Sequence, residues 1–377
     1  MGFRWLLTRS NSPSLPFFAK TGTFAITPQF DDAGSFSEGL AYVIFGEGSA
    51  GKVGYIDKQG KLVITPQFVS GHIPESMLND RSQRDGNHVF RAEPFCEGLA
   101  AVRVADGTNI TVGYIDKTGK MIIKPQFSYS TRFSEGLAVA RVGDENSGKY
   151  GYIDKAGAFK INPQYDFAHE FSEGLAEVEV NHRYGYIDHA AKMVAPAISE
   201  VGNPRFHEGL ALMAVGGREG YFNKDGAIAI NPQFPWAAEF SEGLAGVIVG
   251  DLRPGPGRTV KWAFIDKTGR IVIDPQFDYA GPFSEGLAPV VINHRTGYID
   301  KSGKFAITPQ FDYGASFSQG LAVVRIGDES SGKYGFIDKS GRMVITPTFD
   351  SADSFAEGLA RVRVGDVYTG KYGFIYR

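Results

Sequence analysis

Short apolar runs alternate with polar, glycine-rich stretches along almost the whole chain. In one representative segment, Leu321 to Ile326 is rich in β-branched residues and bounded by glycines, which predicts a strand. Gly335 to Ile337 begins a second strand, and Arg342 to Thr346 forms a third. The chain shows no sustained helical periodicity with capping residues, so any helices should be short. The pattern therefore predicts an all-β protein.

The tetrapeptide Asp338-Lys339-Ser340-Gly341 separates the second and third of these strands. An Asp side chain accepts hydrogen bonds from backbone two residues further on, and Gly readily adopts positive φ. We therefore predict a tight turn here. Pro347 should end the third strand, because proline cannot donate to a β-ladder.

The same unit recurs throughout the chain, marked by the tetrapeptide Glu-Gly-Leu-Ala or a close variant. The repeat glycines are Gly39, Gly98, Gly136, Gly174, Gly209, Gly243, Gly286, Gly320 and Gly358. A periodic chain of this kind folds as one array, whatever its length would suggest about domain number. We assign residues 1–16 to an N-terminal extension and 17–377 to nine tandem repeats, with an insertion at about 69–93.

Two architectures suit nine such units. An open, solenoid-like stack of three-stranded antiparallel meanders is favoured, because propeller blades usually have four strands and number four to eight. Phe17 to Gly22 also matches the middle strand and turn, and Gly373 to Ile375 supplies that strand again, so a ring would have one to spare. A closed β-propeller-like ring is the alternative, since a terminal strand can close a ring and remove the sheet edges.

Most recurrent residues have a structural interpretation. One phenylalanine precedes each glycine marker, and its regular place predicts an aromatic core shared by neighbouring units. These residues are Phe36, Phe95, Phe133, Phe171, Phe206, Phe240, Phe283, Phe317 and Phe355. The recurrent carboxylate, Glu in eight copies and Gln319 in one, should accept backbone N–H groups at a strand entry and not bind a metal.

The combined motifs F-S-E-G-L-A, Y-G-Y-I-D-K-x-G and I-x-P-Q-F-D resemble the bacterial WG repeat, named for a Trp-Gly at the start of the middle strand. The resemblance covers about Phe17 to Arg377. The naming dipeptide departs here: four copies have Tyr-Gly, and Trp occurs only in Trp262-Ala263. The resemblance implies an all-β repeat module with no assigned chemistry and a role in binding or scaffolding.

Catalytic chemistry has no support in the sequence. The seven histidines and single cysteine show no zinc-ligand spacing, and the Gly-Asp loops carry too few acids for calcium. Neither a phosphate-binding glycine motif nor a nucleophile elbow occurs. We predict a non-enzymatic protein with no catalytic, cofactor-binding or metal-binding residues. A net charge of −3 gives no basic field for nucleic acid.

Specificity should therefore reside where the repeat pattern breaks, in the insertion and in the loop Arg253 to Arg258, and at the tryptophans. The candidate interaction residues are His72, Met77, Arg81, Arg84, Trp236, Arg253, Arg258 and Trp262. The favoured function is protein–protein interaction or scaffolding. The alternative is an envelope or cell-surface glycan-binding module that uses exposed aromatics.

The apolar segments of the chain bear on its localisation. No apolar run approaches the length that spans a bilayer, so we predict no membrane insertion. Met1 to Phe18 contains an apolar stretch interrupted by Arg4, without the longer apolar region and cleavage site of a secretory signal. A cytoplasmic location is favoured over export, unless a targeting segment precedes this sequence.

Overall fold

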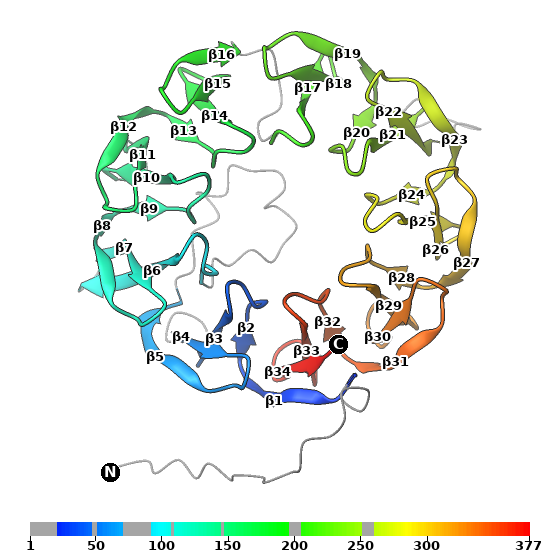
Figure 1. Cartoon of the computed structure of the whole chain (residues 1–377), viewed down its shortest axis with the longest axis horizontal. Coiled ribbons are helices and arrows are strands. Elements are labelled where there is room, and N and C mark those ends of the chain that lie inside the picture. The colour runs from blue at the N-terminus through cyan, green and yellow to red at the C-terminus, as the bar shows by residue number, and fades with distance from the viewer. Residues whose placement is uncertain are drawn as a thin grey trace.

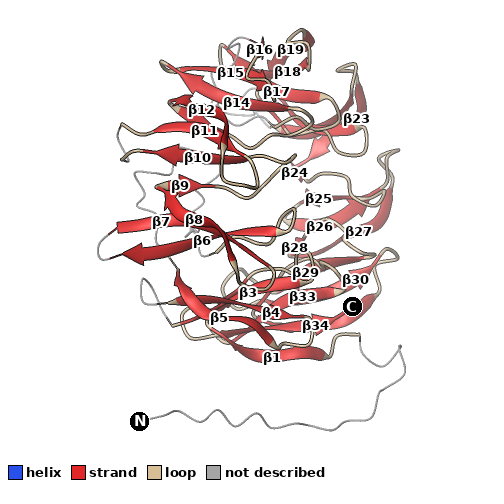
Figure 2. Cartoon of the chain, turned by 60° about the vertical axis from the view of Figure 1, so that its left-hand side comes forward, coloured by secondary structure: helices blue, strands red, loops and turns tan. Residues whose placement is uncertain are grey.

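The chain forms a closed ring of nine antiparallel β-sheets around a central opening (Figure 1). This computed structural model describes residues 21–46, 51–70, 92–106, 109–144, 147–195, 205–250 and 260–377. We number the sheets as blades 1 to 9 in chain order, starting from the sheet that contains β2. The secondary structure of the described residues is entirely β (Figure 2).

Each complete blade has four strands, ordered from the centre to the rim (Figure 1). The inner strands are β2 (Asp32–Ala33), β9 (Tyr129–Ser130), β13 (Phe167–Ala168), β20 (Trp236–Ala237), β24 (Tyr279–Ala280), β28 (Tyr313–Gly314) and β32 (Ser351–Ala352). The second strands are β3 (Leu40–Phe45), β6 (Leu99–Asp106), β10 (Ala138–Val142), β14 (Leu175–Val180), β17 (Leu210–Val215), β21 (Leu244–Val249), β25 (Ala288–Ile292), β29 (Leu321–Ile326) and β33 (Leu359–Val364).

The third strands are β4 (Lys52–Asp57), β7 (Asn109–Asp116), β11 (Lys149–Ile153), β15 (Arg183–Asp188), β18 (Arg218–Asn223), β22 (Lys261–Asp266), β26 (Arg295–Ile299), β30 (Lys333–Asp338) and β34 (Lys371–Tyr376). The outer strands are β5 (Leu62–Val69), β8 (Met121–Phe127), β12 (Phe159–Tyr165), β16 (Met193–Ala195), β19 (Ile228–Phe234), β23 (Ile271–Phe277), β27 (Phe305–Phe311), β31 (Met343–Phe349) and β1 (Phe24–Phe30). In the described residues, blades 2 and 5 have no inner strand.

The ring is closed by pairing between the two ends of the described chain. Strand β1 is the outer strand of blade 9, where it runs antiparallel to β34 with Phe30 opposite Tyr372. The preference for an open stack was therefore wrong, and the closed ring that was the alternative is the structure. Gly22 belongs to the turn that follows β34, because its N–H bonds the Tyr376 carbonyl at 2.8 Å. Phe17 to Lys20 lie outside the described residues.

The expectation of three strands per unit missed the inner strand. This strand has only two residues, and it lies between the outer strand of one blade and the second strand of the next, as β32 does between β31 and β33. A pair of residues carries no alternating pattern, so nothing in the local sequence could reveal it. Its position is set by backbone pairing with the second strand, as for Ser351 opposite Arg363.

Proline does not end the outer strand, contrary to the sequence prediction. Pro347 lies inside β31, at a bulge where the register shifts between Tyr334–Phe349 and Phe336–Ile345. A bulged residue makes no ladder hydrogen bond, so proline is tolerated. The bulge brings the backbone of β31 close to Gly335 in β30. A Cβ atom added at Gly335 would lie 2.5 Å from the Ile345 carbonyl oxygen. This contact explains why eight of the nine third strands carry a glycine at this position.

The two axial faces of the ring are built differently. On one, which we call the turn face, lie the Asp-Lys-x-Gly turns and the Glu-Gly pairs, because Leu40 at the start of β3 pairs with Asp57 at the end of β4. On the other, the loop face, lie the connections between second and third strands, near Phe45 and Lys52. The turn prediction is confirmed: Gly341 has φ of 83°, and Asp338 Oδ1 accepts the Ser340 N–H at 3.0 Å.

Candidate functional site

The recurrent glutamates form a ring of contacts between blades on the turn face. Each side chain accepts a hydrogen bond from the marker glycine N–H of the next blade, at 2.8 to 3.1 Å. The acceptors are Glu38, Glu97, Glu135, Glu173, Glu208, Glu242, Glu285, Gln319 and Glu357. The expected backbone acceptor role is therefore correct, but the bond is made to a neighbouring blade and not within one repeat.

Most of these glutamates also meet a lysine from the turn of the next blade. Lys155 Nζ lies 3.0 Å from Glu97 Oε2, and Lys58 Nζ lies 3.0 Å from Glu357 Oε2. Burial opposes ionisation of Glu97, but the hydrogen bonds from Lys155 and Gly136 outweigh it and lower the pKa of its carboxyl. These carboxylates are therefore engaged in hydrogen bonds and ion pairs between neighbouring blades.

The recurrent phenylalanines occupy the core, as predicted. Each packs edge-on or tilted against an aromatic side chain in the third strand of the preceding blade, with ring centroids 4.8 to 5.4 Å apart. The pair Phe36 and Phe374 repeats this contact across the closure between blades 1 and 9. Because these phenylalanine rings are buried between blades, they are not accessible for stacking on a ligand.

One position that differs between blades lies between the inner and second strands, on what we call the inner wall. The position just before each core phenylalanine carries Ser35, Pro94, Arg132, Glu170, Arg205, Glu239, Pro282, Ser316 and Ser354. Glu170 Oε2 lies 3.4 Å from Arg132 Nε and 3.0 Å from Arg205 Nη2, so blades 3 to 5 are linked by ion pairs. At this position blades 3 to 6 carry charged side chains, and blades 7, 8, 9 and 1 carry proline or serine.

The two predicted tryptophans meet in one aromatic cluster near the loop face. Their ring centroids are 4.7 Å apart, and Tyr279 of the next blade lies 5.3 Å from Trp262. Trp262 is 8% exposed and belongs to the core between blades, whereas Trp236 is 41% and Tyr279 50% exposed. Trp236 is therefore accessible to a partner, and Trp262 mainly supports it.

The other predicted interaction residues lie outside the described part of the chain. These are His72, Met77, Arg81, Arg84, Arg253 and Arg258. The sequence interpretation overlooked Tyr279 and the charged inner-wall residues Arg132, Glu170 and Arg205. A signal existed for the charged residues, because the nine copies disagree at their position while the phenylalanine that follows it recurs.

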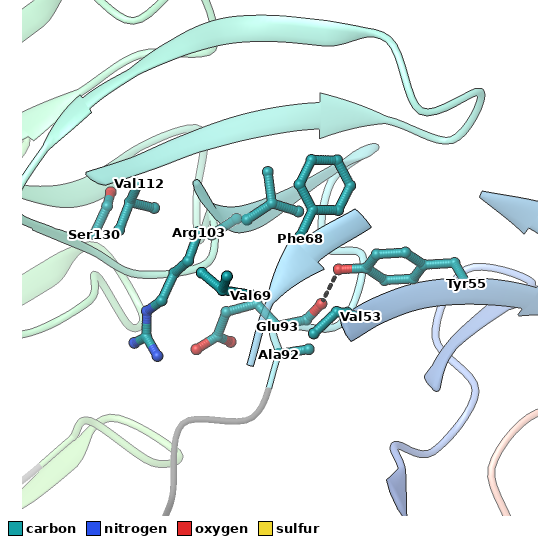
Figure 3. Close-up of a pocket in the computed structure, with 11 residues that line it drawn as sticks. Val53, Tyr55, Phe68, Val69, Ala92, Glu93, Arg103, Val112 and Ser130 are labelled. Atoms are coloured by element: carbon teal, nitrogen blue, oxygen red, sulfur yellow. Dashed lines mark hydrogen bonds between the residues drawn. The ribbon is translucent and has the colours of Figure 1, made fainter. Parts of the chain in front are cut away.

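A small cavity lies where blade 2 lacks an inner strand (Figure 3). Its volume is about 20 Å³, and Tyr55, Glu93 and Arg103 lie among its lining residues. The Tyr55 hydroxyl donates to the Glu93 carbonyl at 2.9 Å. Burial, followed by the nearby Glu170 charge, raises the pKa of the Glu93 carboxyl to about 7. This space suits a single water molecule and is too small for an organic ligand.

The described residues contain no group of three or more His, Cys, Asp or Glu side chains placed to hold a metal ion. Within the same ranges, no helix has the length and apolar character needed to cross a membrane.

Several solved structures are similar to this chain at low sequence identity. A eukaryotic initiation factor is 11% identical with a TM-score of 0.48, covering 75% of this chain and 85% of that one. The β-propeller domain of the Trilobed protease from Pyrococcus furiosus is 10% identical with a TM-score of 0.40, covering 75% and 93%. Hsv2p from Kluyveromyces lactis is 6% identical with a TM-score of 0.37, covering 65% and 94%. No curated protein sequence matches the chain.

A family model for the WG containing repeat matches eight segments, which together span more than half of the chain. They are residues 20–47, 54–70, 113–145, 150–182, 220–252, 262–293, 297–329 and 334–368. Each segment contains the glycine-supported bulge, the turn or the Glu-Gly contact that builds a blade. The protein belongs to the WG-containing repeat family.

Proposed function

We propose that this protein is a non-enzymatic docking platform that binds a protein partner on its loop face. One observation carries the proposal. The recurrent carboxylates and core phenylalanines are engaged in contacts between blades, while Trp236 and Tyr279 stay exposed on either side of the buried Trp262. In a ring of equivalent units, side chains that the fold does not require are the ones free to specify a partner.

The composition of the loop face supports a protein partner. Besides the aromatic cluster, the last residue of the second strand is apolar and 38 to 49% exposed in five blades: Val142, Val180, Val215, Ile326 and Val364. Apolar residues and aromatic anchors are enriched in the cores of protein interfaces. The nine-fold frame holds these side chains on strands, so a partner would meet a preorganised surface.

The test is capture of partners from the native host with a photo-crosslinker placed on the loop face. We expect a discrete protein to be captured by the wild type and lost from the double variant Trp236→Ala, Tyr279→Ala. Ile228→Ser is the matched control, because Ile228 is 50% exposed but begins an outer strand at the rim. Equal capture by the double variant and the wild type would contradict the proposal.

A further inference from the structure

A second cavity lies beside the inner strands where blades 8, 9 and 1 meet. It is open to solvent, and its volume is about 460 Å³. It is lined by Ser35, Tyr313, Ala315, Val323, Ala352, Asp353, Ser354, Phe355 and Ala356. This cavity is distinct from the aromatic cluster of blades 6 and 7.

Small residues border the cavity on blade 9. Ser354 stands where blades 4 and 5 carry Glu170 and Arg205. Ala356 stands where six blades carry a serine that donates to the phenylalanine carbonyl of the next blade: Ser37, Ser134, Ser172, Ser241, Ser284 and Ser318. Alanine has no hydroxyl group, so blade 9 does not make this contact.

Hydroxyl groups, a carboxylate and an aromatic ring border the space. Tyr313 is 44% exposed, and its ring lies against the cavity. Within the described part of the chain, the hydroxyls of Ser35, Ser354 and Tyr313 make no hydrogen bond to protein. The Asp353 carboxylate is fixed by Arg361, whose Nε lies 2.6 Å from Oδ2. A ligand would therefore meet three hydroxyl groups, an oriented carboxylate and an aromatic ring.

The charges around the cavity argue against an ionic ligand. Arg361 is shared between Asp353 and the buried Asp32, 3.5 Å away, so these two carboxylates carry one more negative charge than Arg361 offsets. The nearby Arg325 supplies the second positive charge. A cation would also approach Arg325, whose guanidinium lies 5.9 Å from the centre of the Tyr313 ring. An anion would approach Asp353. Both are disfavoured relative to a neutral ligand with many hydroxyl groups.

We propose that this cavity is a binding site for a neutral saccharide. One apolar C–H face of the sugar would pack on Tyr313, because an aromatic ring offers a flat apolar surface with a polar rim. Sugar hydroxyls would donate to Asp353 and exchange hydrogen bonds with Ser35 and Ser354, which can both donate and accept. The site is independent of protein docking on the loop face and does not require it.

The experiment is saturation-transfer-difference NMR on the full chain with glucose, galactose and N-acetylglucosamine as probes. Glucosamine and glucuronate serve as the cationic and anionic comparisons. We expect transfer to at least one neutral sugar, strongest at the protons of one face, and weaker transfer to both charged sugars. Absence of transfer to all three neutral sugars, or equal transfer to the charged ones, overturns the proposal.

Variants locate the site. Tyr313→Ala should abolish transfer, whereas Tyr279→Ala should preserve it, because Tyr279 is the equivalent exposed residue of blade 7 and does not line the cavity. Should Tyr313→Ala fail to fold, Ser354→Leu fills the cavity at a position where other blades accommodate Glu or Arg. Saturation transfer to the sugar that persists in a folded Tyr313→Ala or Ser354→Leu variant would contradict the proposal. Loss of transfer in Tyr279→Ala alone would also contradict it, because the sugar would then bind elsewhere.

Discussion

The side chain of Glu357 accepts a hydrogen bond from the backbone N–H of Gly39, at 3.0 Å, across 318 residues of chain. The other eight pairs of neighbouring blades are joined by the same kind of hydrogen bond, as between Glu38 and Gly98 and between Glu97 and Gly136. The junction between blades 9 and 1 therefore resembles the rest. The ring therefore closes without a special interface, apart from the pairing of β1 with β34.

Replacing Glu357 by alanine should lower the free energy of unfolding by about 1–2 kcal/mol. The substitution leaves the Gly39 N–H without its acceptor and removes the ion pair with Lys58, whose partial exposure limits the loss. Glu357→Gln should cost less, because Gln319 makes the equivalent bond to Gly358 at 2.9 Å. Urea denaturation measures both, and equal losses would show that only the charge matters.

Stability should fall in acid as the turn-face carboxylates are protonated. Burial opposes ionisation of Glu357, but hydrogen bonds from Lys58 and Gly39 lower its pKa below the ordinary 4.5, and Glu208 and Glu285 behave in the same way. A lowered pKa in the folded state stabilises above the unfolded value and is lost as pH falls through the folded value. Melting temperatures should therefore decline below about pH 4.5. Glu357→Gln should show a shallower decline, and an identical pH profile would contradict this origin.

Gly341→Val should cost about 1–3 kcal/mol, because the turn needs positive φ. An added Cβ would also lie 3.0 Å from Ile307 Cγ2 in the preceding blade. The contribution of crowding can be separated with two alanine variants. Gly358 has a similar φ of 86° but nothing within 4 Å, so Gly341→Ala should destabilise more than Gly358→Ala in thermal melts. Equal losses would assign the whole effect to backbone strain.

Deleting residues 1–30 should open the ring. The deletion removes β1 and leaves β34 with an unpaired edge, which also uncovers Phe374 and Ile375 in the core. Hydrogen–deuterium exchange should accelerate at Tyr372 and Phe374, which pair with Phe30 and Ile26, and the variant should tend to self-associate. Amides of blade 6 serve as the internal reference. Unchanged protection in β34 would show that β1 is dispensable.

Local sequence determined much of the blade. The strand at Leu321 to Ile326, the turn at Gly341 and the burial of Phe317 all follow from residues close together in the chain, where β-propensity, positive φ and apolar character act directly. The nine-fold recurrence also identified the side chains required by the fold, and the family resemblance rested on the same residues.

Closure, strand number and the sites depended on tertiary structure. Whether Glu357 meets Gly39 depends on the small rotation between successive blades accumulated nine times, and no single repeat encodes that sum. The two-residue inner strands exist only because the second strand offers them an edge. Ser35, Tyr313 and Asp353 are unremarkable in sequence, and they share a cavity because blades 8, 9 and 1 are brought together by the closed ring.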